Sequence, residues 1–386
     1  MLRKIVFWSH LTAGLIAGVV VFVMSVTGVL LTYQRQLTLW ADTRGLDGSP
    51  LAAGAARLAP EALLGRVLRT EKGKPTAVVW RGAADAPVAV SFGRERTVFV
   101  NAYTGQTLGA GGTKTRKFFS WVTDWHRWMG AAAGEGRDRG KAITGASNLL
   151  FFFLLLSGAI LWIPKQWRRA NLRNIMWFRR GLRPKARDFN WHHVFGFWMF
   201  LPLAIIIPSG VVISYPWASN LVFRVMGETP PPRNPEGGGG AGGGRPAPPP
   251  DLAGLDPLWT QAVARVPGWK ILTLQIPAKP DAPVSFTIDR GTGGQPQTRA
   301  TLAFDRGTGR VTKWEPFAAT SPGRKLRGIL RFAHTGEVLG LAGQTLAGIA
   351  SLAAALLVWT GISLSLRRFA AWRARRKLPR AAEAAG

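Results

Sequence analysis

Four long apolar windows interrupt a chain that is otherwise rich in polar and charged residues. They cover residues 11–32, 143–163, 194–214 and 341–364, and none of them contains Lys, Arg, Asp or Glu. The first would span about 33 Å as a helix, close to the ~30 Å hydrocarbon core of a bilayer. Helices in the core of a soluble protein seldom have this length without a charge. The pattern therefore predicts an integral membrane protein with a bundle of four transmembrane helices.

The long segments between the windows show shorter apolar periods. Residues 34–118 carry a helix-like pattern at 60–70, followed by strand-like runs at 77–81, 88–92 and 97–101. Residues 216–330 repeat this order, with a helix-like pattern at 255–266 and runs at 271–276, 284–289, 298–304 and 310–315. In each segment a strand runs into Thr-Gly, at Thr104-Gly105 and Thr308-Gly309, where glycine supplies the positive φ of a tight turn. The pattern predicts two small α+β modules, each a helix followed by an antiparallel meander.

Residues 229–250 consist almost wholly of Pro and Gly, a composition that cannot form a core and predicts a mobile loop. They contain a formal G-x-G-x-x-G match at Gly237, Gly239 and Gly242. Because no strand precedes it and no helix follows it, the match does not indicate a nucleotide or flavin site.

Much of the net charge of +30 lies close to the ends of the apolar windows. Residues 164–189 hold nine Lys or Arg and one Asp, and the tail after Leu366 holds seven Lys or Arg and one Glu. By the positive-inside rule both termini and this loop are cytoplasmic, and an attraction to anionic headgroups explains the charge without nucleic acid. The first window is too long for a cleaved signal peptide, so we expect an uncleaved anchor.

This topology predicts an order of alternating membrane and extramembrane segments. The transmembrane segments are 1–33, 143–163, 190–215 and 331–366; the outer modules are 34–118 and 216–330; an interfacial segment is 119–142; the cytoplasmic loop and tail are 164–189 and 367–386.

The chain has five histidines and no cysteine. His10 and His192 open the first and third windows, whereas His126 and His334 lie upstream of the second and fourth. If the helices cross in alternate directions, His10 and His192 meet at one face of the membrane, and His126 and His334 at the other. Two neutral imidazoles at one depth can be the axial ligands of a haem iron. Without cysteine a c-type attachment is excluded, so the pattern predicts two haem b groups held by these four histidines.

Alternatives to each histidine ligand exist. A single histidine can also be a hydrogen-bonded structural residue, and His193 lies about 100° around the helix from His192, so both cannot face one iron. His192 is favoured because His192-x3-Gly196 repeats the spacing of His10-x3-Gly14. A metal site without haem is disfavoured, since the windows offer no carboxylate or thiolate.

Small residues recur in register with the histidines. Gly28 follows His10 by 18 positions, as Gly210 follows His192, and Gly145 and Gly158 are 13 apart, as are Gly348 and Gly361. The later glycine of each window follows Ser or Thr, at Thr27, Ser157, Ser209 and Thr360. Such residues allow close helix packing or leave room for a flat macrocycle.

His126 lies in an aromatic-rich segment that predicts an interfacial helix. Arg127, Arg331 and Lys325 are near the outer histidine pair in sequence, where they would hold either haem propionates or lipid phosphates.

Four motifs resemble the PepSY-associated transmembrane family of bacterial inner-membrane proteins. They are Phe7-Trp-Ser-His10-x3-Gly14, Trp125-His126-Arg-Trp, Asn190-Trp-His192-His-Val-Phe-Gly196 and His334-Thr-Gly336. The two Thr-Gly-ended meanders are similar to PepSY modules. Members of this family include ferric-siderophore reductases with two b-type haems across the inner membrane.

The resemblance implies a di-haem protein that reduces Fe(III) in a siderophore in the periplasm, with His10, His192, His126 and His334 as axial ligands. Some relatives carry a fused flavin reductase domain, which this chain lacks, so the electron donor would be a cytoplasmic reductase or a membrane quinol. The alternative is a haem-free PepSY membrane protein that binds or regulates a periplasmic partner such as a protease.

Overall fold

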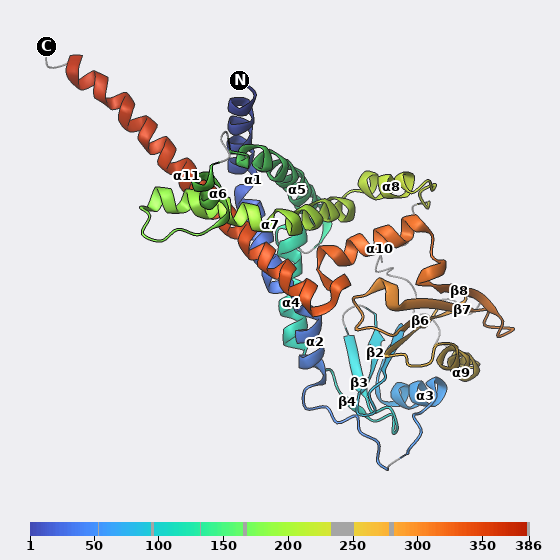
Figure 1. Ribbon diagram of the computed structural model, residues 1–386. Helices are drawn as coiled ribbons and strands as arrows, with labels where there is room; N and C mark the ends of the chain where they lie inside the picture. The colour runs from blue at the N-terminus through green and yellow to red at the C-terminus, as the bar shows by residue number, and fades with distance from the viewer. Residues whose placement is uncertain are drawn as a thin grey trace. The chain divides into compact units, whose positions relative to one another are not determined.

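The computed structural model in Figure 1 describes residues 1–52, 54–93, 96–131, 133–164, 168–232, 251–277 and 282–383, with side chains up to residue 375. The formal G-x-G-x-x-G match and most of the Pro/Gly-rich segment lie outside these residues. The chain forms two compact units. We call residues 1–34, 118–221 and those from 330 onward the membrane unit, and Arg35–Lys117 with Val222–Ile329 the sheet unit.

The membrane unit is built on four long apolar helices, as the hydrophobic windows predict. Each of them is long and apolar enough to cross a membrane. Each of α1 and α7 packs against both α5 and α11. Large apolar side chains such as Ile16, Leu201 and Trp359 are 63–70% exposed on this bundle, which suits a lipid environment. The four helices are α1 (Leu2–Leu31), α5 (Gly134–Trp162), α7 (Pro184–Ser214) and α11 (Gly340–Glu383).

These helices extend beyond the apolar windows because their ends carry charged side chains that reach the polar interface while the backbone stays helical. The shorter helix α6 (Arg169–Met176) also belongs to the membrane unit, whereas α4 (Thr113–Trp128), α8 (Pro216–Val225) and α10 (Pro322–His334) each have residues in both units. The interfacial helix expected around His126 is α4. His334, by contrast, ends a separate helix, α10, which the sequence pattern did not predict.

The sheet unit contains α2 (Gln34–Thr43), α3 (Pro60–Thr70), α9 (Leu255–Arg265) and one antiparallel sheet of eight strands (Figure 1). The strand order is β4-β3-β2-β1-β5-β6-β7-β8. The strands are β1 (Ala77–Arg81), β2 (Val88–Phe92), β3 (Arg96–Val100), β4 (Thr107–Gly109), β5 (Ile271–Gln275), β6 (Val284–Asp289), β7 (Arg299–Phe304) and β8 (Val311–Pro316).

The two meanders, predicted as separate modules, are joined into this single sheet. Strand β1 pairs with β5 over five positions, from Ala77 opposite Gln275 to Arg81 opposite Ile271. Each meander alone would leave the backbone groups of this edge strand unpaired, and the pairing satisfies both edges at once. Side chains from α3, α9 and the six inner strands, β3 to β7 in the sheet order, then share one apolar core, with Trp80 and Phe286 fully buried.

The helices of the two modules also cap each other. The backbone N–H of Glu61, in the first turn of α3, donates to Asp256 Oδ1 at 2.8 Å. In return the N–H of Asp256, in the first turn of α9, donates to Glu61 Oε1 at 3.1 Å. Each carboxylate therefore satisfies a free N–H group of the other helix and lies at the positive end of that helix.

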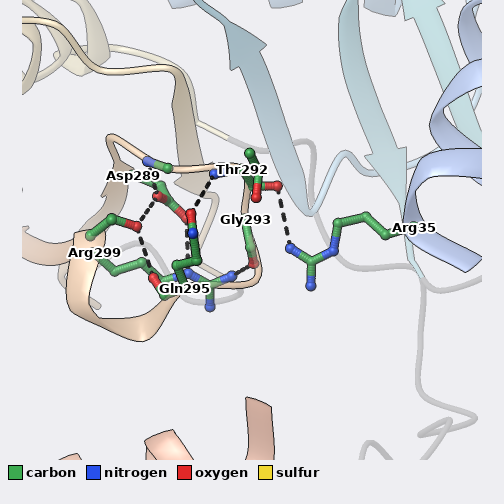
Figure 2. Close-up of polar contacts among 8 residues, drawn as sticks. Arg35, Asp289, Thr292, Gly293, Gln295 and Arg299 are labelled. Atoms are coloured by element: carbon green, nitrogen blue, oxygen red, sulfur yellow. Dashed lines mark hydrogen bonds and ion pairs between the residues drawn. The ribbon is translucent and has the colours of Figure 1, made fainter. Parts of the chain in front are cut away.

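The tight turns form at the expected glycines, with φ of 70° at Gly105 and 66° at Gly309. The longer connection between β6 and β7 is organised by the buried carboxylate of Asp289 (Figure 2). Asp289 accepts from the N–H of Gly291 at 2.6 Å, the hydroxyl of Thr298 at 2.7 Å and Arg299 Nε at 3.0 Å. Arg35 reaches the carbonyl of Thr292 from the other side of the loop.

Candidate functional site

The four predicted ligands lie in the membrane unit, on four different helices. His10 is on α1 and His192 on α7, while His126 and His334 are at the ends of α4 and α10. The rings of His126 and His334 lie edge to face, with centroids 6.4 Å apart and ring planes at 61° to each other. The His10 imidazole lies within electrostatic range of His192. The structure thus brings the outer two histidines together, and His10 and His192 interact electrostatically.

All four histidines share one contact, a hydrogen bond from Nδ1 to a hydroxyl on another helix. The hydroxyls belong to the Ser or Thr that precedes a glycine in each long helix. The pairs are His10 with Ser157 at 2.8 Å, His126 with Thr27 at 3.0 Å, His192 with Thr360 at 2.9 Å and His334 with Ser209 at 3.3 Å.

The direction of these bonds follows from the proton of each hydroxyl. Each hydroxyl lies 2.6–2.8 Å from a carbonyl three or four residues earlier in its own helix, to which it donates its one proton. Its lone pairs therefore accept from the histidine Nδ1–H. His334 Nδ1 also lies 2.9 Å from the Ile206 carbonyl, which can only accept. In all four rings the proton is on Nδ1, so Nε2 keeps the lone pair that a metal needs.

The glycine after each hydroxyl lies against the imidazole. A Cβ placed on Gly158, Gly28, Gly361 or Gly210 would lie 3.4, 3.6, 3.5 or 3.2 Å from Cε1 of its histidine, in the order His10, His126, His192 and His334. The edge of each ring therefore rests on a helix surface that has no side chain. The Ser/Thr-Gly pair is a two-residue cradle in which the hydroxyl orients the ring and the glycine contacts its edge, most tightly at Gly210.

The outer pair has the protonation state and spacing of metal ligands. Burial lowers the pKa of His126 to about 4 and lowers the pKa of His334, so both rings are neutral at pH 7. An imidazole nitrogen binds a metal at about 2 Å, which places the centres of two opposed rings about 6 Å apart. The observed 6.4 Å matches this separation.

The donor set fits a haem better than a bare metal ion. Within the part of the chain that the structure describes, no three His, Cys, Asp or Glu side chains come together as a metal cluster. Each pair therefore offers two protein ligands, too few for a structural zinc ion, which takes four. Two axial imidazoles are the full protein contribution to a low-spin haem.

Two further side chains near the inner pair bear on this fit. The indole N–H of Trp162 is buried without a hydrogen-bond partner among the described residues, and the ring stacks on Phe197 at 4.9 Å. Trp162 is one helical turn beyond Gly158, the cradle glycine of His10. An orphaned donor at this position suits a polar group of a cofactor bound by the inner pair.

His193 differs from its neighbour His192. Its Nδ1 bonds to the Phe189 carbonyl of its own helix at 2.9 Å, and its ring packs on Phe189, with no Ser/Thr-Gly cradle.

The buried Asn190, which opens the motif Asn190-Trp-His192, has a structural role. Its side chain accepts from the N–H of Arg179 and donates to the carbonyls of Asn174 and Trp177, which holds the connection after α6 against α7.

The basic residues expected near the outer pair separate into two groups. Arg127 and Arg331 lie in the membrane unit next to the histidines in sequence, and a third guanidinium, Arg137, joins them. Lys325 belongs to the sheet unit, where Nζ donates to the Ala318 carbonyl at 2.7 Å.

The sequence pattern showed the four Ser/Thr-Gly pairs but not their partners. Each cradle lies in a different helix from its histidine, so only the tertiary fold matches them. The signal that pointed to the cradles was the equal spacing from His10 to Gly28 and from His192 to Gly210. This spacing pointed to the glycines of the cradles. It did not show that each glycine contacts the histidine of another helix.

A family model matches most of the chain, whereas a search of curated proteins gives no match. The family model described as the PepSY-associated TM region matches residues 7–368, which include all four long helices in their apolar parts and both halves of the sheet unit. The chain therefore belongs to the PepSY-associated TM family.

Proposed function

We propose that this protein is a di-haem b oxidoreductase of the bacterial inner membrane, which carries electrons from the cytoplasmic side to the periplasm and reduces ferric iron in siderophores for iron uptake. The observation that carries the proposal is the fourfold cradle. Four histidines, in two pairs, present an unprotonated Nε2 because a hydroxyl of a neighbouring helix holds each Nδ1–H. A purely structural role does not require the same tautomer at four positions.

The residues have distinct roles in this proposal. His10 and His192 would hold the inner haem, and His126 and His334 the outer one. When bound, the two haems would supply one-electron transfer. The hydroxyls fix the orientation of each ring and raise its basicity, and the glycines let it approach the helix. The apolar helices keep water from the path between the pairs.

The reaction needs no acid or base from the protein. One electron passes from the donor through the membrane unit to Fe(III), which becomes Fe(II), and no bond to carbon forms or breaks. Hard oxygen ligands hold the ferric ion more tightly than the ferrous ion, so reduction weakens the chelate. The donor would be a cytoplasmic reductase or a membrane quinol. The basic segment 164–189 and the basic tail orient this donor side toward the cytoplasm.

The first test is the absorption spectrum of the detergent-purified protein, oxidised and dithionite-reduced, with a pyridine haemochrome assay. We expect about two haem b per chain and a low-spin reduced spectrum. A colourless protein from haem-replete cells would overturn the proposal. It would favour a haem-free membrane protein that binds or regulates a periplasmic partner such as a protease.

Single substitutions test the pairing. His126→Ala and His334→Ala should each remove the same haem, and His10→Ala and His192→Ala should each remove the other. His193→Ala is the matched control, because His193 has no cradle, and both haems should remain. Loss of one haem in His193→Ala, with His192→Ala unaffected, would move the ligand by one position.

A further inference from the structure

Two guanidinium groups share one tryptophan close to the outer histidine pair. Arg137 Cζ lies 3.4 Å from the centroid of the Trp128 ring, and Arg127 Cζ lies 4.7 Å from the same centroid. Trp128 ends α4, two residues after His126, while Arg137 comes from the first turns of α5. Stacking on an indole fixes the plane of a guanidinium and leaves its N–H groups available at the edge.

A third arginine adds to this positive charge. Arg331 lies three residues before His334 on α10 and acts electrostatically on Arg127, as Arg137 does. None of the three takes part in an ion pair with a carboxylate of the described residues. The protein thus gathers three cations and leaves their charge unbalanced.

Such a cluster is costly unless an anion completes it. Like charges at short range repel, and the repulsion is stronger beside protein than in water. The hydroxyl of Thr144 donates to the Arg127 carbonyl at 2.9 Å, so the backbone that carries Arg127 is held against α5. Arg127 and Arg331 are nevertheless exposed, so an anion can reach them from solvent.

We propose that Arg127, Arg137 and Arg331 bind the carboxylates of an anionic ferric chelate and hold it beside the His126/His334 pair. This inference rests on the proposed function and narrows its substrate class to chelates with free carboxylates. Planar guanidinium groups match carboxylates through two parallel hydrogen bonds. The two stacked groups on Trp128 and the third on α10 together suit a chelate with more than one acidic arm.

The test compares the oxidation of the dithionite-reduced, haem-loaded protein by two chelates of opposite charge. Ferric citrate is the anionic probe, and a ferric tris-hydroxamate with a free amine is the cationic one. In both cases one electron leaves the protein and Fe(III) becomes Fe(II). Arg127→Gln, Arg137→Gln and Arg331→Gln should each raise KM for ferric citrate about tenfold, the loss of one charge-assisted hydrogen bond. KM for the cationic chelate and the haem content should stay as in the parent.

Arg139→Gln is the matched control, because Arg139 is two residues from Arg137 but is exposed and paired with Glu135 at 3.1 Å. It should leave all of these values unchanged. An equal rise of KM for both chelates, or loss of haem, would overturn the proposal and assign the cluster to the cofactor's own propionates. Unchanged KM in all three variants would overturn it as well.

Calorimetric titration of the purified protein with iron-free citrate separates this inference from the proposed function. The three variants should bind citrate at least tenfold more weakly than the parent. Citrate binding by a colourless protein would leave the anion site standing while the redox function failed. If nanodiscs that contain phosphatidylglycerol abolish citrate binding seen in zwitterionic nanodiscs, the site belongs to lipid phosphate and the proposal is wrong.

Discussion

At the scale of single residues, Thr27 shows how the cradle works. Its hydroxyl donates to the Val23 carbonyl of α1 at 2.6 Å and accepts from His126 Nδ1 at 3.0 Å. The same side chain therefore satisfies its own helix and fixes the imidazole of another. Removal of the hydroxyl takes away the side-chain partner that fixes the ring orientation.

Thr27→Val tests this contribution, because valine keeps the shape and removes the hydroxyl. The affinity of the outer site for haem should fall about 10–100-fold, the usual effect of losing a partner of a metal-binding histidine. The imidazole also becomes a poorer donor to Fe(III), so the midpoint potential of any outer haem that remains should rise. Haem content and a redox titration measure both effects. Thr27→Ser keeps the hydroxyl and should behave as the parent; an equal loss in the serine variant would show that the methyl group matters instead.

The glycines of the cradle make a second prediction at this scale. A Cβ on Gly210 would lie 2.9 Å from Asn148 Nδ2 and 3.2 Å from His334 Cε1, whereas one on Gly28 would lie 3.2 Å from Ser351 Oγ and 3.6 Å from His126 Cε1. Gly210→Ala should therefore destabilise the outer site by about 1–3 kcal/mol through overpacking, and Gly28→Ala by less. Thermal unfolding and haem content measure the difference.

Gly136→Ala is the control for helix propensity. Gly136 is exposed near the start of α5, and alanine there should stabilise the helix by up to about 1 kcal/mol. If Gly210→Ala stabilises the protein as Gly136→Ala does, the glycine is not needed for ring packing.

At the scale of elements, the sequence periodicity predicted most of the fold. The helix at 60–70 and the strands at 77–81 and 88–92 match α3, β1 and β2 at both ends, because their apolar spacing and flanking Gly or Pro signals are local. The helix α10, which ends at His334, was missed, since its strongly basic face resembles a loop. The pairing of β1 with β5 was missed too, because the two strands are far apart in sequence and neither pattern specifies its neighbour.

The candidate site, like the fold, could be predicted only in part from the sequence. Histidines at the ends of apolar windows stand out in a sequence, and their pairing follows from topology alone. The hydroxyl partners and Arg137 depend on which helix faces which, and that choice is made by side-chain packing between α1, α5, α7 and α11. Composition and spacing carry no direct information on those contacts.

The reciprocal capping of α3 and α9 gives a prediction for these elements. Glu61→Ala should weaken the start of α9 rather than that of its own helix, because Glu61 Oε1 accepts from the N–H of Asp256. Asp256→Ala should likewise weaken the start of α3. Loss of a cap costs about 1 kcal/mol, so exchange of the first-turn amides of the opposite helix should become about fivefold faster. Hydrogen–deuterium exchange measures this.

Asp256→Asn is the matched control for the caps, since the amide oxygen still accepts a hydrogen bond. It should keep most of the protection of α3. Faster exchange confined to α3 in Glu61→Ala, with α9 unchanged, would contradict reciprocal capping.

At the scale of the whole molecule, the chain is a tandem repeat. The helices α1 and α7 carry His10 and His192 with Thr27-Gly28 and Ser209-Gly210 at equal spacing. The helices α4 and α10 each carry an outer histidine in their last turn, and α5 and α11 each hold a cradle for an inner one. The meanders repeat as well and pair as equivalents through β1 and β5. Duplication of one half thus yields both histidine pairs, since each pair takes one histidine from each half.

The orientation of this repeat in the membrane can be tested by labelling single cysteines. The chain has no cysteine, so a single introduced cysteine reports on one position without background. Ala83 is exposed in the connection between β1 and β2, and Arg180 is exposed in the basic segment between α5 and α7. The positive-inside rule places Arg180 in the cytoplasm and Ala83 outside it. A membrane-impermeant maleimide should therefore label Ala83→Cys in intact spheroplasts and label Arg180→Cys only after permeabilisation. Unchanged haem content would show that both variants fold as the parent. The reverse labelling would put the outer histidine pair on the cytoplasmic side, where it cannot deliver electrons to a periplasmic chelate.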